Sequence, residues 1–134
     1  MRSLQSPGRS PVLAPNGMAS TSHVLSTETA VNVLRNGGNA MDAAIAACAV
    51  QGVVEPESTG IGGDCFCLYS EGGGDKIIAM NGSGRAPAAL TAEWLLDQGI
   101  SEIVQHSPHA VTIPTAVDAW VQLNRDYGSK PLSD

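Results

Sequence analysis

Apolar residues recur every three or four positions in the first part of the chain, and this spacing predicts an amphipathic helix. Ala30, Val31 and Leu34 form its apolar face. Ser26 is the predicted N-cap, because a serine hydroxyl can accept a hydrogen bond from a free N–H group of the first turn. The helix is expected to end at residues 36–38, Asn-Gly-Gly, where glycine can adopt the left-handed conformation that closes a helix.

A second helix is predicted directly after this joint. Asn39 is its expected N-cap, and Asp42 lies three residues later. Residues 43–50 are apolar on every side, and a helix of that kind is expected to be buried all round. Glu55 should end the segment, because the residue before a proline avoids the helical region.

The pattern changes to an alternation of period two further along the chain. Residues 65–69 predict a strand, residues 71–75 (EGGGD) a hairpin turn, and residues 76–80 the partner strand. Residues 18–22 and 111–113 predict two more short strands.

Helices return in the last third. Thr91 is the expected cap of a short helix over residues 92–98, and a longer helix should run from Pro114 and Thr115 to about Tyr127. The chain is therefore a mixed α and β sequence without an internal repeat. Residues 1–16 are rich in Ser, Pro, Gly and Arg, and we expect them to form a disordered arm.

Small side chains dominate the expected core. Hydrophobic residues make up 43% of the 134 residues, but aromatic residues only 4%. Alanine and valine bury little area per side chain, and each Å² contributes only about 25 cal/mol. A core of this kind should be marginal alone, which indicates a piece of a larger fold.

Charge and cysteine content narrow the class of protein. The formal net charge is −6 and the seven basic residues are scattered, so we expect neither a nucleic-acid partner nor a membrane surface. Three cysteines are too few for a disulfide framework and fit a reducing compartment. The first residues lack the apolar stretch of a signal peptide, and the predicted location is cytoplasmic.

The cysteines raise two candidate chemistries. Cys65 and Cys67 lie on one side of a predicted strand and, with His106 and His109, offer the residue types of a zinc site. Cys65 with His23 as base could be a nucleophile pair, although no spacing supports it. Buried, reduced core cysteines are the favoured interpretation.

Residues 60–63, Gly-Ile-Gly-Gly, are a third candidate. They lack the third glycine of a dinucleotide fingerprint and precede a strand, so a close backbone passage or the wall of an active site is favoured over a phosphate loop. Around them, Glu55, Glu57 and Asp64 could supply an acid/base pair, but clustered acids in a turn are more often solvated. Ser83 in Gly-Ser-Gly does not form a nucleophile elbow.

Arg85 is the principal binding candidate. It follows the second predicted strand, in the stretch NGSGRAP. A guanidinium group can hold a carboxylate through two parallel hydrogen bonds, although a surface or salt-bridged arginine would leave the same pattern.

Six stretches together resemble one family. They are, in order, GMASTSH, ETAVNVLRNGGNAMDAAIAACAVQGVVEP, TGIGGDCF, NGSGRAP, VTIPTAVDAW and DYGSKPL. This series is similar to the start of the large subunit of γ-glutamyltranspeptidases, and it covers about residues 17–134.

The resemblance implies an α+β fold, the four-layer αββα sandwich of N-terminal-nucleophile hydrolases, of which residues 17–134 would be an N-terminal part. It implies a precursor that cuts itself in two. The new N-terminal threonine of the small subunit would attack a γ-glutamyl amide such as glutathione, with its own α-amine as base, and water or an amino-acid acceptor would resolve the γ-glutamyl-enzyme.

The same resemblance implies that this threonine lies beyond Asp134. The partners of the chain would be the remainder of the large subunit, the small subunit and a small-molecule γ-glutamyl substrate. No metal or organic cofactor is implied.

Three positions depart from the family pattern. The family arginine that holds the substrate α-carboxylate stands four residues before the proline of an R-E-x-A-P pattern, where this chain has Ser83. Arg85 lies two residues later and would need a shifted backbone to take the role. Thr115 replaces a usual glycine, and Asp64 stands where many members have another glycine.

The leading interpretation is therefore the scaffold and carboxylate-binding part, through Arg85, of a γ-glutamyl hydrolase or transferase. A cephalosporin-acylase-like amidase of the same fold is the first alternative. A non-catalytic structural or binding module is the second.

Overall fold

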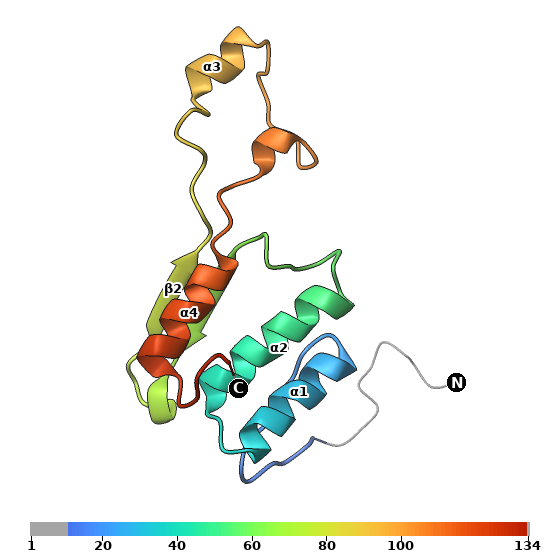
Figure 1. Cartoon of the computed structure of the whole chain (residues 1–134), viewed down its shortest axis with the longest axis vertical. Helices are drawn as coiled ribbons and strands as arrows, with labels where there is room; N and C mark the ends of the chain where they lie inside the picture. The colour runs from blue at the N-terminus through green and yellow to red at the C-terminus, as the bar shows by residue number, and fades with distance from the viewer. Residues whose placement is uncertain (1–10, 134) are drawn as a thin grey trace, which may run out of the picture.

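The computed structural model describes residues 11–133. In this part of the chain three helices and an antiparallel strand pair form a body, from which a long arm projects (Figure 1). No helix among these residues is long and apolar enough to cross a membrane.

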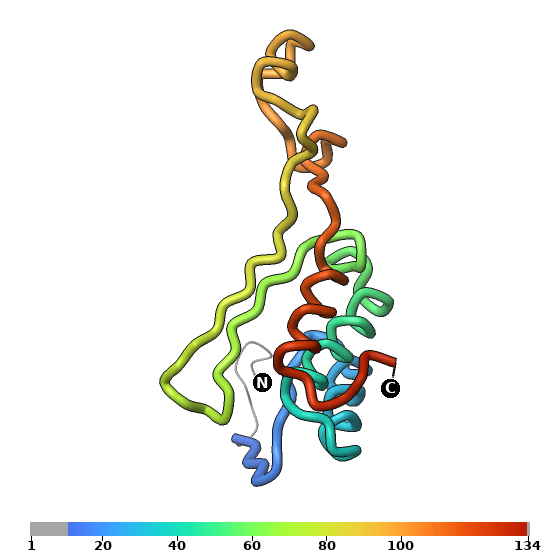
Figure 2. Tube along the Cα trace, turned by 60° about the vertical axis from the view of Figure 1, so that its left-hand side comes forward, coloured from blue at the N-terminus to red at the C-terminus, as the bar shows by residue number. Residues whose placement is uncertain are grey.

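Helices α1 (Val24–Arg35) and α2 (Ala40–Val54) form the predicted helical hairpin and lie side by side (Figures 1 and 2). The joint is as expected: Gly37 has a φ of +84°, and Asn39 Oδ1 accepts hydrogen bonds from the N–H groups of Met41 and Asp42, both at 3.0 Å. The Asp42 carboxylate in turn accepts the Asn39 N–H at 2.8 Å, which completes a capping box.

The predicted N-cap of α1 is wrong. His23 is the cap, and its Nδ1 accepts the Leu25 N–H at 3.2 Å. Ser26 lies inside the helix, fully buried, and its hydroxyl donates to the carbonyl oxygen of Ala47 in α2. The serine serves the close packing of the two helices, because a buried hydroxyl needs a hydrogen-bond partner.

The prediction that α2 is buried on all sides is also wrong for the described residues. Met41, Ala43, Ile45 and Ala47 are buried, facing α1 on one side and α4 with the sheet on the other. A third side is exposed, and Val53 there is 78% exposed. The uniformly apolar sequence therefore has packing partners on only part of its circumference.

Strands β1 (Cys65–Tyr69) and β2 (Ile78–Gly82) pair antiparallel, with Cys65 opposite Gly82 and Tyr69 opposite Ile78. The predicted hairpin is confirmed, but β2 begins two residues later than expected because the connection, with the short 3-10 helix η1 (Glu71–Gly73), extends through residue 77. Helix α4 (Ala116–Tyr127) covers one face of this pair and contacts both strands and α2.

One of two buried apolar clusters lies between α1 and α2. The other, which contains the larger side chains, lies between α2, α4 and the sheet. Buried Met41, Ile45 and Leu123 form it, and Cys65 and Cys67 pack against them. Phe66 and Leu68, on the opposite face of β1, are 65% and 78% exposed. One helical layer thus covers one face of one sheet layer, which is part of an αββα sandwich, as predicted.

Residues 83–115 leave the body as an arm that both views show extended (Figures 1 and 2). The arm carries α3 (Ala92–Asp97), capped by Thr91 as predicted, and the 3-10 helix η2 (Pro108–Ala110). The rings of Trp94 and His109 meet edge to face at 5.7 Å.

The two additional strands are not present. Residues 18–22 are irregular, and residues 111–113 make one inter-segment backbone bond, from the Ile113 N–H to the Arg85 carbonyl at 3.0 Å. An extended segment becomes a strand only when a neighbour supplies a ladder of such bonds. The expected disordered arm over residues 1–16 falls largely outside the described residues.

Candidate functional site

A groove of about 480 Å³ lies where β2 ends, the arm begins and α4 starts. Its walls come from the end of the hairpin, the returning segment of the arm and the first two turns of α4. The residues that line it include Met80, Asn81, Arg85, Ile113, Asp118 and Gln122.

Gly84 sets the course of the chain beside this groove. Its φ is +72°, and a Cβ at this position would lie 2.1 Å from the backbone oxygen of Ile113. The left-handed conformation and the close approach both require glycine. Because Arg85 follows directly, its position depends on this glycine.

The backbone of the same turn is tied to the returning segment. The Arg85 carbonyl accepts the Ile113 N–H, and the Ser83 carbonyl accepts the Thr112 hydroxyl at 3.2 Å. Thr115, the residue in place of the family glycine, donates its hydroxyl to the Gly82 carbonyl. These bonds hold the two segments at the base of the arm side by side.

The glycine loop at residues 60–63 holds the segment that leads into α4, which forms one wall of the groove. The Gly63 carbonyl accepts the N–H groups of Thr115 and Ala116, at 3.2 and 3.1 Å, and so fixes the first turn of α4. At the start of the loop, the Cα of Gly60 passes close to α2, where a Cβ on Gly52 would lie 3.3 Å from it, and this is a close backbone passage of the predicted kind. The loop therefore has a structural role, through its backbone contacts with α2 and α4.

Arg85 is exposed at the groove and has no salt-bridge partner within 4.0 Å among residues 11–133. Across the groove, Asp118 lies in the first turn of α4 and accepts a hydrogen bond from Gln122 Nε2 at 2.6 Å. The groove therefore offers one cation and one anion on different walls. Sequence reasoning found Arg85 but missed Asp118, because only the fold brings residues 85 and 118 together.

The structure does not assemble the alternative sites. No group of three or more His, Cys, Asp or Glu side chains suited to a metal ion exists within residues 11–133. Cys65 and Cys67 face the core, while His106 and His109 belong to the arm. His23 caps α1 through its Nδ1, and no hydrogen bond joins it to Cys65 within residues 11–133.

The thiols are poorly suited to act as nucleophiles. Burial raises the pKa of Cys65, and the charge of Asp64 raises it further, against a hydrogen bond with Trp120 that lowers it. Burial also raises the pKa of Cys67. All three cysteines are unpaired, as predicted, although Cys48 is exposed and Cys65 and Cys67 are only partly buried.

The three acidic residues predicted as a possible acid/base pair lie outside the groove. Glu55 accepts hydrogen bonds from Ser22 and Gln51, next to the end of α2. Glu57 and Asp64 are exposed. None of the three lines the groove.

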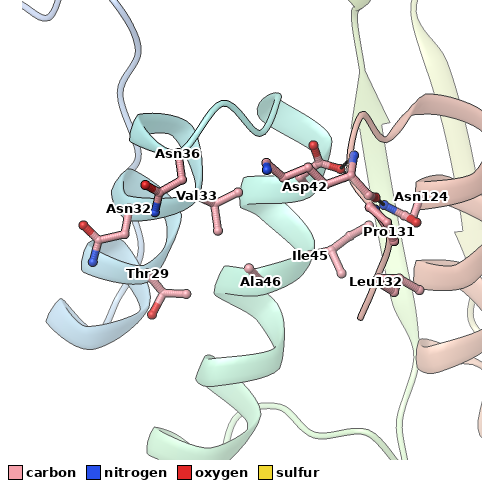
Figure 3. Close-up of a pocket in the computed structure, with 11 residues that line it drawn as sticks. Thr29, Asn32, Val33, Asn36, Asp42, Ile45, Ala46, Asn124, Pro131 and Leu132 are labelled. Carbon is pink, nitrogen blue, oxygen red and sulfur yellow. Dashed lines mark hydrogen bonds between the residues drawn. The ribbon is translucent and has the colours of Figure 1, made fainter. Parts of the chain in front are cut away.

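A second cavity, of about 330 Å³, lies between α1, α2 and the segment after α4 (Figure 3). Figure 3 shows Asp42 close to Asn124 and Pro131, on the side of the cavity away from Thr29 and Asn32 of α1. Asp42 accepts hydrogen bonds from Ser129 N–H and Oγ, Asn39 N–H, Lys130 N–H and Asn124 Nδ2. Burial opposes ionisation, but these hydrogen bonds outweigh it and lower the pKa of Asp42.

This anchor was not predicted, because its donors lie up to 88 residues away in sequence. The only local signal was the position of Asp42 in the capping box. With its oxygens occupied by the protein's own donors, Asp42 stabilises the fold.

Comparisons with known proteins agree with the fold and the motifs. The family model described as Gamma-glutamyltranspeptidase matches residues 26–134. The Glutathione hydrolase-like YwrD proenzyme of Bacillus subtilis is 35% identical over 124 residues, which are 92% of this chain and 23% of that protein.

Two solved structures are also similar. The γ-glutamyltranspeptidase of Helicobacter pylori has a TM-score of 0.82 and 30% identity, over 92% of this chain and 36% of that chain. The cephalosporin acylase of Bacillus halodurans has a TM-score of 0.78 and 36% identity, over 98% of this chain and 26% of that chain. The chain thus spans about a quarter to a third of the length of these relatives.

Proposed function

Because the chain belongs to the γ-glutamyltranspeptidase family, we propose that it is the N-terminal part of an enzyme that hydrolyses or transfers the γ-glutamyl group of glutathione and related amides. The match over residues 26–134 carries this proposal, and the relationship to a glutathione hydrolase-like proenzyme supports it.

In this proposal the chain supplies scaffold and substrate binding. The nucleophile is the N-terminal threonine of the small subunit, outside residues 1–134. Its hydroxyl oxygen attacks the γ-carbonyl carbon, the amine leaves with a proton, and water or an amino acceptor then cleaves the acyl ester.

Arg85 binds the α-carboxylate of the γ-glutamyl group. It is exposed at the groove, unpaired among the described residues and held on a turn that Gly84 and the Ile113 bond define. A fixed guanidinium presents two parallel donors to a carboxylate, which lysine cannot reproduce.

The complete precursor tests this function. We expect two bands on a denaturing gel, the smaller beginning with threonine, and release of p-nitroaniline from γ-glutamyl-p-nitroanilide. A single unprocessed band without release would refute the proposal.

Arg85→Ala tests the assigned role. We expect kcat/KM for γ-glutamyl-p-nitroanilide to fall about tenfold to hundredfold, mainly through KM, because a charge-assisted hydrogen-bonded pair is lost. Arg85→Lys should recover only part of the lost kcat/KM. Arg125→Ala is the control, since Arg125 is exposed and pairs with Asp126, and it should leave kcat/KM unchanged.

A second candidate function is an amidase for another acyl group, and the likeness to a cephalosporin acylase favours it. Hydrolysis of a β-lactam side-chain amide by the complete precursor, without hydrolysis of γ-glutamyl-p-nitroanilide, would select this alternative.

A further inference from the structure

We propose that Cys48 and Cys65 form a reversible disulfide that ties α2 to β1 when the protein meets a small disulfide oxidant. Cys48 is the exposed thiol that reacts first, and Cys65 is the partly buried thiol that completes the bond. This modification site lies outside the groove and does not depend on the proposed function.

Contacts at both ends of α2 set its direction relative to β1. At its start, Asn39 Nδ2 donates to the Tyr127 carbonyl at 2.7 Å, and the Tyr127 ring lies 5.3 Å from the ring of Tyr69, the last residue of β1. Near its other end, Gly52 lies close to Gly60, in the loop that leads into β1. The late part of α2 therefore lies beside the early part of β1.

Cys48 belongs to the face of α2 that points toward the sheet. It follows Met41 by seven residues and Ile45 by three, a spacing that keeps side chains on one face of a helix. Met41 and Ile45 are buried in the cluster against which Cys65 and Cys67 pack. Partial desolvation of its sulfur, followed by the charges of Cys65 and Cys67, raises the pKa of the Cys48 thiol, as expected for neighbouring thiols.

Of the two thiols on β1, Cys65 is the expected partner. It is the first residue of the strand, and after desolvation its charge contributes most to the raised pKa of Cys48. Cys65 and Cys67 are poorly placed to bond to each other, because alternate residues of a strand lie about 6.6 Å apart with parallel side chains. Cys67 therefore stays a thiol.

The reaction consists of two thiol–disulfide exchanges. The Cys48 thiolate attacks one sulfur of the oxidant, which forms a mixed disulfide and releases one small thiol. The Cys65 thiolate then attacks the Cys48 sulfur, forms the Sγ–Sγ bond and releases the second small thiol, so that the oxidant takes up two electrons and two protons. Because the pKa values of both thiols are raised, the exchange is slow at neutral pH and faster in mild alkali.

The test treats the complete, reduced protein at about pH 8.5 with bis(2-hydroxyethyl) disulfide, which carries no γ-glutamyl group. Remaining thiols are blocked with N-ethylmaleimide, and a protease that cleaves after glutamate then places Cys48 in residues 29–57 and both thiols of β1 in residues 58–71. Mass spectrometry without reductant should show these two peptides joined, and dithiothreitol should separate them. The oxidised form should melt about 2–5 °C above the reduced form, because closing a loop restricts the unfolded chain.

Three variants assign the bond. Cys67→Ser is the matched control and should keep the joined peptides. Cys65→Ser should abolish them and leave the mixed disulfide with the oxidant on Cys48, whereas Cys48→Ser should abolish both. The rise in melting temperature on oxidation should disappear in these last two variants. A cooperative melting transition of the reduced form verifies that each variant folds.

Three results would overturn the inference. The first is a wild type without joined peptides. The second is a yield of joined peptides in Cys65→Ser equal to that of the wild type, which would make Cys67 the partner. The third is joined peptides only in a species of doubled mass on a non-reducing gel, which would place the bond between two copies of the chain. The proposed function would stand in each case, because none of these measurements involves a γ-glutamyl substrate.

Discussion

The buried carboxylate of Asp42 connects two segments that are distant in sequence. Its carboxylate joins the start of α2 to the segment after α4, through donors on Asn39, Asn124, Ser129 and Lys130. A local capping box is thereby extended into a tertiary anchor.

Asp42→Asn should destabilise the complete protein by about 2–4 kcal/mol, because the amide loses the charge and turns an N–H₂ group toward existing donors. Urea unfolding followed by tryptophan fluorescence measures this. Asp75→Asn, at an exposed position of the hairpin connection, should change the unfolding free energy by less than about 0.5 kcal/mol. Equal effects of the two substitutions would contradict the assigned role.

The same carboxylate predicts a pH dependence. Its pKa is lowered in the folded protein from the ordinary value of 3.8, so its stabilisation is fully present above that value and is lost as the pH falls through the folded pKa. Between pH 5 and pH 3 the wild type should therefore lose more stability than Asp42→Asn. Parallel melting-temperature profiles of the two proteins would show that Asp42 contributes nothing to acid unfolding.

At the scale of elements, the turn after β2 controls the geometry of the groove. Gly84→Ala places a Cβ 2.1 Å from the Ile113 carbonyl at a φ of +72°, where alanine costs roughly 1–2 kcal/mol before the clash is counted. We expect a lower melting temperature and a kcat/KM loss at least as large as that of Arg85→Ala.

Gly62→Ala is the matched control, since its added Cβ would meet open space. It should leave both the melting temperature and kcat/KM near the wild-type values. If Gly84→Ala behaves like Gly62→Ala, the turn does not position Arg85.

The elements that the sequence predicted are those whose signals are local. Such signals depend on neighbours within a few positions. They include the cap at Asn39, the helix end at Gly37, the hairpin around residues 71–75 and the helix that ends at Tyr127. The groove depends on contacts between residues 85 and 113, which no periodicity reveals.

The wrong predictions of secondary structure have a common cause, which is that they depend on contacts between segments distant in sequence. The location of Ser26 inside α1 follows from the approach of Ala47 in α2, and the absence of strands at residues 18–22 and 111–113 follows from the lack of a pairing ladder. Arg85 could be proposed from its motif, whereas Asp118 required the fold.

At the scale of the whole molecule, the outer face of the sheet is an exposed apolar surface. Phe66 and Leu68 are 65% and 78% exposed there, and both belong to the strand whose other side packs into the core. In an αββα sandwich a sheet lies between a helical layer and a second sheet. This face should therefore be covered in the complete enzyme.

Leu68→Asp should have opposite effects in two contexts. In the isolated 134-residue chain it should reduce aggregation and the binding of an apolar fluorescent dye, because it breaks an exposed apolar patch. In the complete precursor it should abolish self-cleavage or soluble expression, since burying leucine contributes about 1.5–3 kcal/mol and an unpaired buried carboxylate costs more.

Val12→Asp, at an exposed position of the irregular N-terminal segment, is the control and should leave self-cleavage intact. A complete precursor that tolerates Leu68→Asp as well as Val12→Asp would mean that this face stays open to solvent, and the sandwich would then have to be closed by a different surface of the chain.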